Sequence, residues 1–252
     1  MSARKEQRTA KLISLIAERQ RADVAELAAD LGVSQVTIRK DLDELEKKGF
    51  IRREHGSAHI NDTDNVAGRL TFHYDEKRKI AVKAAEFIHN GDTVMIESGS
   101  CCALLARVIA DTLSDVTIIT NSVFIAEYIR DSRNVSVILL GGIYQRDSQC
   151  LIGPMIRDTA GNYNVKYLFA GTDGWSERTG FTNRDPLRVQ AVRDMAHSAE
   201  NLVILTESGK FGTPGTIPMN IPKQPRCVIT DNDLHSDIRD VLTGSGIQII
   251  TV

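Results

Sequence analysis

Seven short runs of apolar, mostly β-branched residues recur through the C-terminal part of the chain, and they restrict its fold more than any other feature. The runs lie at 93–97, 116–120, 135–140, 167–170, 202–205, 227–230 and 247–252. They lack the apolar–polar alternation of a strand with one wet face, and helical stretches separate them. This pattern is typical of parallel strands buried on both faces. We therefore predict a doubly wound, mostly parallel α/β domain.

The first sixty residues have a different pattern, which predicts three helices. Apolar residues at helical spacing indicate a first helix over about 5–18. Asp23 stands in N-cap position for a second helix, VAELAADL, and Glu26 completes the sequence of a capping box. Gly32 allows the left-handed turn between two crossing helices, and Ser34 caps a third helix that ends at Gly49. Three short helices with one tight turn are typical of a helix-turn-helix.

The third predicted helix has one apolar and one polar face. Ile38, Leu42 and Leu45 fall at i, i+4 and i+7 and are expected to face the core. The N-terminal half of such a helix enters the major groove in helix-turn-helix proteins. The residues that we predict to contact DNA from this helix are Ser34, Gln35, Val36, Thr37, Arg39 and Lys40.

A basic hairpin follows that helix and separates two interpretations. Charged helix surfaces are usually only solvated, so the helices alone are also compatible with an ordinary helical hairpin. Residues 50–60, however, read as strand, turn and strand, with Arg52, Arg53 and His55 beside the tip. Cations there are well placed for phosphate or minor-groove contacts. We therefore predict a winged helix-turn-helix domain over 1–60 that binds double-stranded DNA.

The remaining sequence predicts a second domain and excludes several classes of protein. Residues 61–75 are polar and lack periodicity, so we expect a linker there and the α/β domain over 76–252. No apolar run approaches the roughly 20 residues of a membrane span, and no signal peptide is evident. The four cysteines form no metal-ligand spacing. We expect a cytoplasmic protein without metal, disulfide or membrane contact.

Small polar residues follow the predicted strands at the edge where doubly wound folds bind ligands. Glycines allow backbone N–H groups to approach an anion, and Lys210 supplies a charge. Such loops are also rich in these residues for turn and capping reasons, so each loop alone favours that simpler explanation. Five loops at one edge favour a site. With no G-x-G-x-x-G and no Walker lysine, we expect a small phosphorylated ligand and no cofactor.

The run from Val24 to Ala58 resembles the N-terminal domain of the DeoR family of bacterial sugar-metabolism regulators. The resemblance extends over nearly the whole chain through the later motifs S-G-S, T-N-S, G-x-D-G and K-F-G. The resemblance implies an effector domain similar in fold to ribose-5-phosphate isomerases. It implies that phosphate lies on the first loop and sugar hydroxyls on Asp173 and Lys210. The implied effector-site residues are Ser98, Gly99, Ser100, Cys101, Thr120, Asn121, Gly141, Gly142, Asp173 and Lys210.

The chain departs from the family pattern at several of these positions. Glu97 and Glu207 stand where aspartate is usual, and Cys101-Cys102 stand where paired threonines are common. Lys40 replaces an arginine, and lysine lacks the bidentate fork that reads guanine. Thiols are weaker hydrogen-bond donors than hydroxyls. The phosphate contacts and the identity of the ligand are therefore expected to be unusual.

Two main functions are compatible with these features, and a third, a purely architectural DNA binder, is hard to reconcile with the elaborate C-terminal site. We expect a transcriptional regulator, in this family most often a repressor, that is controlled by a phosphorylated sugar and works as a homo-oligomer, a dimer or a tetramer. The alternative is an isomerase-like enzyme with a DNA-binding appendage, in which Asp173, Glu207 and Lys210 act as acid/base groups. Cys101 and Cys102 also leave open a redox switch, beside a role as small buried apolar residues.

Overall fold

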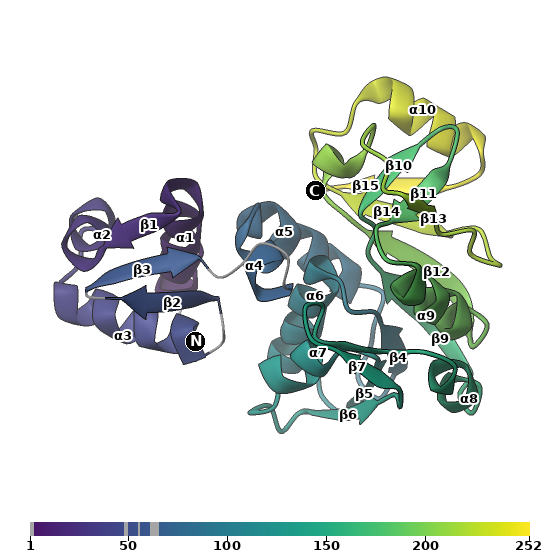
Figure 1. Cartoon of the computed structure of the whole chain (residues 1–252), viewed down its shortest axis with the longest axis horizontal. Helices are drawn as coiled ribbons and strands as arrows, with labels where there is room; N and C mark the ends of the chain where they lie inside the picture. The colour runs from purple at the N-terminus through teal and green to yellow at the C-terminus, as the bar shows by residue number, and fades with distance from the viewer. Residues whose placement is uncertain (1–2, 48–49, 55, 61–65) are drawn as a thin grey trace. The chain divides into compact units, whose positions relative to one another are not determined.

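The computed structural model describes residues 3–47, 50–54, 56–60 and 66–252. It consists of two compact units, Met1–Asp75 and Glu76–Val252, which are described separately (Figure 1). Each unit has its own buried apolar core.

The first unit combines helices with a small antiparallel sheet. Its elements are α1 (Ala3–Arg19), β1 (Arg21–Asp23), α2 (Val24–Leu31), α3 (Gln35–Lys47), β2 (Ile51–Glu54), β3 (Ser57–Ile60) and α4 (Val66–Thr71). The sheet has the order β1-β3-β2, and both pairings are antiparallel. The predicted winged helix-turn-helix is confirmed, with β2 and β3 as the wing.

The core of this unit explains which face of α3 is left outside. Ile38, Leu42 and Leu45 are buried as their spacing predicted. Asp41 is buried beside them, and its carboxylate accepts hydrogen bonds from Arg8 of α1 at 2.6 and 3.2 Å. A buried charge requires such a partner. Apolar packing and this ion pair therefore orient α3 against α1.

The helix boundaries differ from expectation where tertiary contacts replace local ones. The Asp23 side chain makes no cap hydrogen bond, so the predicted capping box is wrong. Asp23 instead lies in β1 opposite Ser57, and Val24 N–H donates to the Gly56 carbonyl at 3.2 Å. Gly32 has the predicted left-handed conformation, with φ 63°. Gly49, the predicted end of the third helix, lies outside the described residues.

The expected linker is not irregular throughout. Residues 61–65 lie outside the described part, but α4 covers Val66–Thr71 and α5 begins at Tyr74. Val66, Ala67 and Leu70 of α4 are buried. A helix of six residues is too short to produce a clear apolar period in the sequence. The absence of periodicity therefore did not indicate the absence of structure.

The second unit has a central sheet whose seven strands all run parallel. Their order is β15-β14-β12-β9-β4-β5-β6 (Figure 1). The strands are β4 (Thr93–Ile96), β5 (Val116–Thr120), β6 (Val135–Leu139), β9 (Val165–Ala170), β12 (Ala199–Leu205), β14 (Cys227–Thr230) and β15 (Gln248–Thr251). Each predicted apolar run contains or overlaps one of them, so the α/β prediction is confirmed.

Helices cover this sheet: α5 (Tyr74–Ala85), α6 (Ser100–Thr112), α7 (Val123–Tyr128), α8 (Met155–Ala160), α9 (Pro186–Ala196) and α10 (Ser236–Gly244). One core joins sheet residues such as Met95, Leu168 and Ile204 to Ile156 of α8 and Val192 of α9. Alternate strand residues point to the other face, where Tyr167 meets Phe87 edge to face. In the described part of the chain, no helix is long and apolar enough to cross a membrane.

Two small antiparallel sheets stand beside the main sheet, and the sequence did not predict them as such. One is the hairpin of β7 (Ile143–Gln145) and β8 (Cys150–Ile152). The other has the order β10-β11-β13, from Gly174–Ser176, Gly180–Asn183 and Ile217–Pro218. A single turn of 3-10 helix, η1 (Ser208–Lys210), follows β12. Strands of two to four residues carry too little pattern to be recognised from sequence.

Gly142 should be required for stability, whatever its relation to a ligand. Its φ is +154°, and a Cβ there would lie 2.6 Å from the Ile152 carbonyl oxygen. We expect Gly142→Ala to lower the free energy of unfolding by about 1–3 kcal/mol, as overpacking does. Gly209→Ala is the control, because a Cβ at Gly209 meets no atom within 4 Å. Equal urea midpoints for the two variants would contradict the prediction.

Candidate nucleic-acid interface and effector site

The N-terminal half of α3 presents an exposed surface. Ser34 Oγ accepts a hydrogen bond from Thr37 N–H at 3.2 Å, which confirms the predicted cap. Gln35, Arg39 and Lys40 are exposed, and Val36 is 59% exposed. Gln35 Oε1 accepts from Arg39 Nη2 at 3.2 Å, so the guanidinium has an oriented partner on the same surface. Cations, an amide and an exposed valine suit contacts with phosphates, base edges and thymine methyls.

The two wing arginines have different surroundings. Arg52 is exposed, with Glu54 at 3.6 Å. Arg53 forms an ion pair with Asp43 of α3, and its N–H donates to Glu46 Oε1 at 3.0 Å. Arg53 therefore holds the wing against α3. This ion pair competes with the DNA contact that we predicted for Arg53. His55 lies outside the described residues.

In the second unit, the chain changes direction across the sheet between β4 and β9. Strand β4 has β5 on one side and β9 on the other, and later strands extend outward from each. Ligands of doubly wound sheets bind beyond the strand ends at such a point. Gly99 and Gly171 face each other there, since a Cβ on Gly99 would lie 3.4 Å from Gly171 Cα. The two glycines let the loops after β4 and β9 meet.

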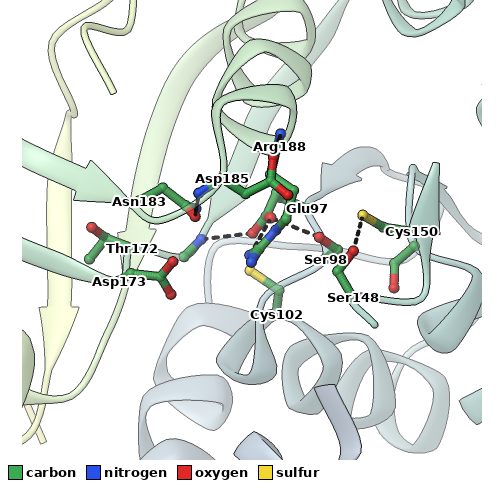
Figure 2. A network of polar contacts seen from close by, with 12 residues as sticks. Glu97, Ser98, Cys102, Ser148, Cys150, Thr172, Asp173, Asn183, Asp185 and Arg188 are labelled. Atoms are coloured by element: carbon green, nitrogen blue, oxygen red, sulfur yellow. Dashed lines mark hydrogen bonds and ion pairs between the residues drawn. The ribbon is translucent and has the colours of Figure 1, made fainter. Parts of the chain in front are cut away.

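A buried ion pair lies directly beneath these glycines (Figure 2). Glu97, at the end of β4, is only 1% exposed, and Arg188 of α9 approaches its Oε1 at 3.6 Å. Glu97 also accepts hydrogen bonds from Ser98 Oγ at 2.8 Å and Gly171 N–H at 3.2 Å. Burial lowers the pKa of Arg188, but Glu97 and Asp173 outweigh it and raise that pKa. The Arg188 guanidinium therefore stays charged beside Glu97.

The start of α9 is connected to this pair and to the β7–β8 hairpin. Asp185 caps α9 by accepting from Leu187 N–H at 2.8 Å and Arg188 N–H at 3.1 Å. Gln145 of β7 donates to the same carboxylate. Burial opposes ionisation of Asp185, but these hydrogen bonds lower its pKa. The chain of contacts from Gln145 through Asp185 and Arg188 to Glu97 joins the hairpin to the end of β4.

A second charged cluster lies at the ends of β12 and β14. Lys77 of α5 is buried, and its Nζ lies 3.1 Å from Glu207 Oε1. Cys101 Sγ donates to Glu207 Oε2 at 3.9 Å. Burial and Glu207 raise the pKa of the Cys101 thiol, and the charges of Lys77 and Lys210 oppose this effect. Asp231 accepts from Ser208 N–H at 2.7 Å. Two lysines thus stand near the first turn of α6, where an anion is expected.

The predicted effector residues divide into two groups. Ser98, Gly99, Cys101, Asp173 and Lys210 surround the ends of β4, β9 and β12, and Ser100 is the first residue of α6.

The remaining four lie at or just after the ends of β5 and β6, and several of them hold local structure in place: Thr120, Asn121, Gly141 and Gly142. Thr120 Oγ1 accepts from Ser122 N–H, Asn121 Nδ2 donates to the Leu151 carbonyl at 3.0 Å, and Gly142 lies against Ile152. Within the described residues, Asn121 Oδ1 is buried without a hydrogen-bond partner, so this side chain retains an acceptor for a ligand.

Sequence reasoning missed Arg188 and Lys77, although a signal was present. Lys77 lies on the buried stripe of α5, with Ile80, Ala81 and Ala84 at i+3, i+4 and i+7. Arg188 precedes Ala191, Val192 and Met195 on α9 at the same spacing. A charged residue on an apolar stripe must find a buried partner. That partner could not be named from sequence, because it follows a distant strand.

All four cysteines are free and buried. Burial raises the pKa of Cys101, Cys102 and Cys150, and raises that of Cys227 to about 11. The reactive species of a cysteine is the thiolate. These surroundings disfavour the redox switch and favour small apolar residues that fill the core.

We therefore expect no thiol of the native chain to react readily with Ellman's reagent at pH 8. Because the pKa values are raised, the thiolate population is small at this pH and grows only as pH rises further. All four thiols should react in guanidinium chloride, which serves as the control. Rapid modification of one thiol without unfolding would contradict this assignment.

The chain was compared with known proteins. Residues 8–64 match the DeoR-like helix-turn-helix domain, and residues 72–232 match the DeoR C terminal sensor domain. The HTH-type transcriptional regulator GolR of Listeria innocua is 28% identical, covering 96% of this chain and 97% of the relative. The putative aga operon transcriptional repressor of Escherichia coli O157:H7 is 28% identical, covering 98% and 93%. Both are named as transcriptional regulators, not enzymes.

Among solved structures, ribose 5-phosphate isomerase from Plasmodium falciparum has a TM-score of 0.40 at 17% identity, over 54% of this chain and 52% of that chain. A likeness this low does not assign a function. The two domain matches together span most of the sequence. The chain belongs to the DeoR family of transcriptional regulators.

Proposed function

We propose that this chain is a cytoplasmic repressor of a carbohydrate operon, that it binds its operator as a homo-oligomer, and that a phosphorylated sugar controls it. The observation that carries the proposal is the presence, on one chain, of an exposed α3 surface and of a charged site at the strand ends of a sensor domain. The E. coli relative is named as a repressor of the aga operon, which supports the carbohydrate role.

The surroundings of α6 favour a phosphate group. Helix α6 has thirteen residues, and its cap residue Gly99 has no side chain to occupy the N–H groups of the first turn. Such a helix start attracts an anion. Lys77 and Lys210 add positive charge near Cys101 on that turn. The phosphate is therefore expected here, with sugar hydroxyls towards Asp173.

For the DNA interface, we expect Arg39→Ala to reduce the preference for the operator by about 10- to 100-fold, because a base contact is worth about 1–3 kcal/mol. The operator is first selected by the wild type from a random duplex pool. Arg52→Ala should instead weaken binding to operator and random DNA alike and reduce the salt dependence. Fluorescence anisotropy at several salt concentrations measures both effects. An Arg39→Ala protein that discriminates as well as the wild type would disprove the groove assignment.

For the effector site, we expect one member of a panel of sugar phosphates to raise the melting temperature and to release the operator. At a concentration 100 times its Kd, a ligand adds about 2.7 kcal/mol to the free energy of unfolding. Lys210→Ala should abolish the shift. Lys166→Ala is the matched control. Lys166 is an exposed lysine near the start of β9, whereas the candidate effector site lies beyond the C-terminal end of that strand. Equal shifts in melting temperature for the two variants would show that Lys210 does not contact the ligand.

A further inference from the structure

Exposed apolar side chains gather around the β7–β8 hairpin. Seven large apolar side chains are exposed in the described part of the chain, and five of them lie between residues 139 and 187: Leu139, Ile143, Tyr144, Met155 and Leu187. Ile143 is the most exposed, at 67%. Single exposed apolar residues are ordinary, but a group of them marks an interaction surface.

Close contacts connect four of these residues, Leu139, Ile143, Met155 and Leu187, into one surface. Met155 Cε lies 3.1 Å from the position of a Cβ on Gly141, close after Leu139 in the chain. Ile143 Cδ1 lies 3.6 Å from the corresponding position on Gly153. The Gln145–Asp185 hydrogen bond brings the start of α9, with Leu187, to the end of β7. We call Leu139, Ile143, Met155 and Leu187 the hairpin face.

Two unpaired strand edges border the hairpin face. Within the described residues, β7 pairs with β8 alone, and β6 pairs with β5 alone at the edge of the seven-stranded sheet. Tyr144 and Ile143 are neighbours on β7 and point to opposite sides of the hairpin, yet both are exposed. An exposed apolar strand with open backbone groups can pair with another chain.

The charges around the hairpin face indicate which chain covers it. Arg146 and Asp147 follow β7, and Arg157 and Asp158 lie on α8 beside Met155; all four are exposed. Each pair holds both signs on adjacent residues. A two-fold axis places the same surface on both sides, so the basic member of one copy can meet the acidic member of the other. A partner of uniform charge would be repelled by half of these groups.

We infer that the hairpin face is the two-fold interface between two copies of this chain. The inference rests on the proposed function, because a helix-turn-helix regulator reads two half-sites and needs such a partner. It adds the surface that brings the copies together. The same face touches the effector site, since Gln145 of β7 contacts Asp185, whose helix carries Arg188 to Glu97. The hairpin and Arg188 therefore lie on one continuous chain of contacts.

The first test is the mass of the full chain in solution, by light scattering over a range of concentrations. The wild type should show at least twice the 27.8 kDa of one chain. The variant Ile143→Asp with Met155→Asp should show the mass of one chain. Val82→Asp is the matched control, because Val82 is an exposed apolar residue on α5, outside the hairpin face. A monomeric wild type, or an oligomeric double variant, overturns the inference.

A second test does not depend on disrupting the interface. Because the four native cysteines are buried, Ile143→Cys introduces the one exposed thiol among the described residues. A short bis-maleimide should cross-link this variant into dimers on a denaturing gel, whereas Val82→Cys should remain monomeric. Equal cross-linking of the two variants overturns the inference.

The two proposals fail in distinguishable ways. If the regulatory function is wrong, the wild type binds neither a selected duplex nor a sugar phosphate, whatever its mass. If only the interface is wrong, the double variant keeps the wild-type mass and the wild-type operator affinity. When both hold, the double variant keeps the melting shift with the sugar phosphate but loses at least tenfold in operator affinity.

Discussion

The Glu97–Arg188 ion pair is the interaction on which the sensor domain depends most directly. A parallel sheet brings the loops after β4 and β9 together at the point where the chain changes direction, and Glu97 lies buried there. An unpaired carboxylate in this position would be costly, so α9 must present Arg188 to it. Asp185 begins that helix and also binds Gln145, so the pair orients the hairpin as well as the helix.

The Lys77–Glu207 pair repeats the arrangement beyond the end of β12. Lys77 comes from α5, the first helix after the DNA-binding unit, and Glu207 precedes the η1 turn that carries Lys210. This ion pair therefore holds α5 against the loop that follows β12.

Several features were predictable from sequence because their cause is local. Apolar runs indicated each strand of the sheet, and the spacing of Ile38, Leu42 and Leu45 indicated the buried face of α3. Ser34 and Gly32 marked the turn, since a cap and a left-handed glycine act within a few residues. Two local predictions failed, at Asp23 and in the linker. At Asp23, pairing with the wing and the Val24 N–H to Gly56 carbonyl hydrogen bond replace the side-chain cap that was expected. In the linker, the helix Val66–Thr71 is too short to show an apolar period.

The sequence by itself determined the two domain types, the order of the strands along the chain and the polar loops at their ends, because burial pattern and turn chemistry are written in neighbouring residues. Only the tertiary structure decided which of those loops meet. It placed Arg188 on Glu97 and Lys77 on Glu207, 91 and 130 positions apart by their numbers. It also turned Arg53 towards Asp43 and set Gly142 against Ile152. A charged residue on an apolar stripe indicates that a buried partner exists, but the strand order in the sheet determines which residue that partner is.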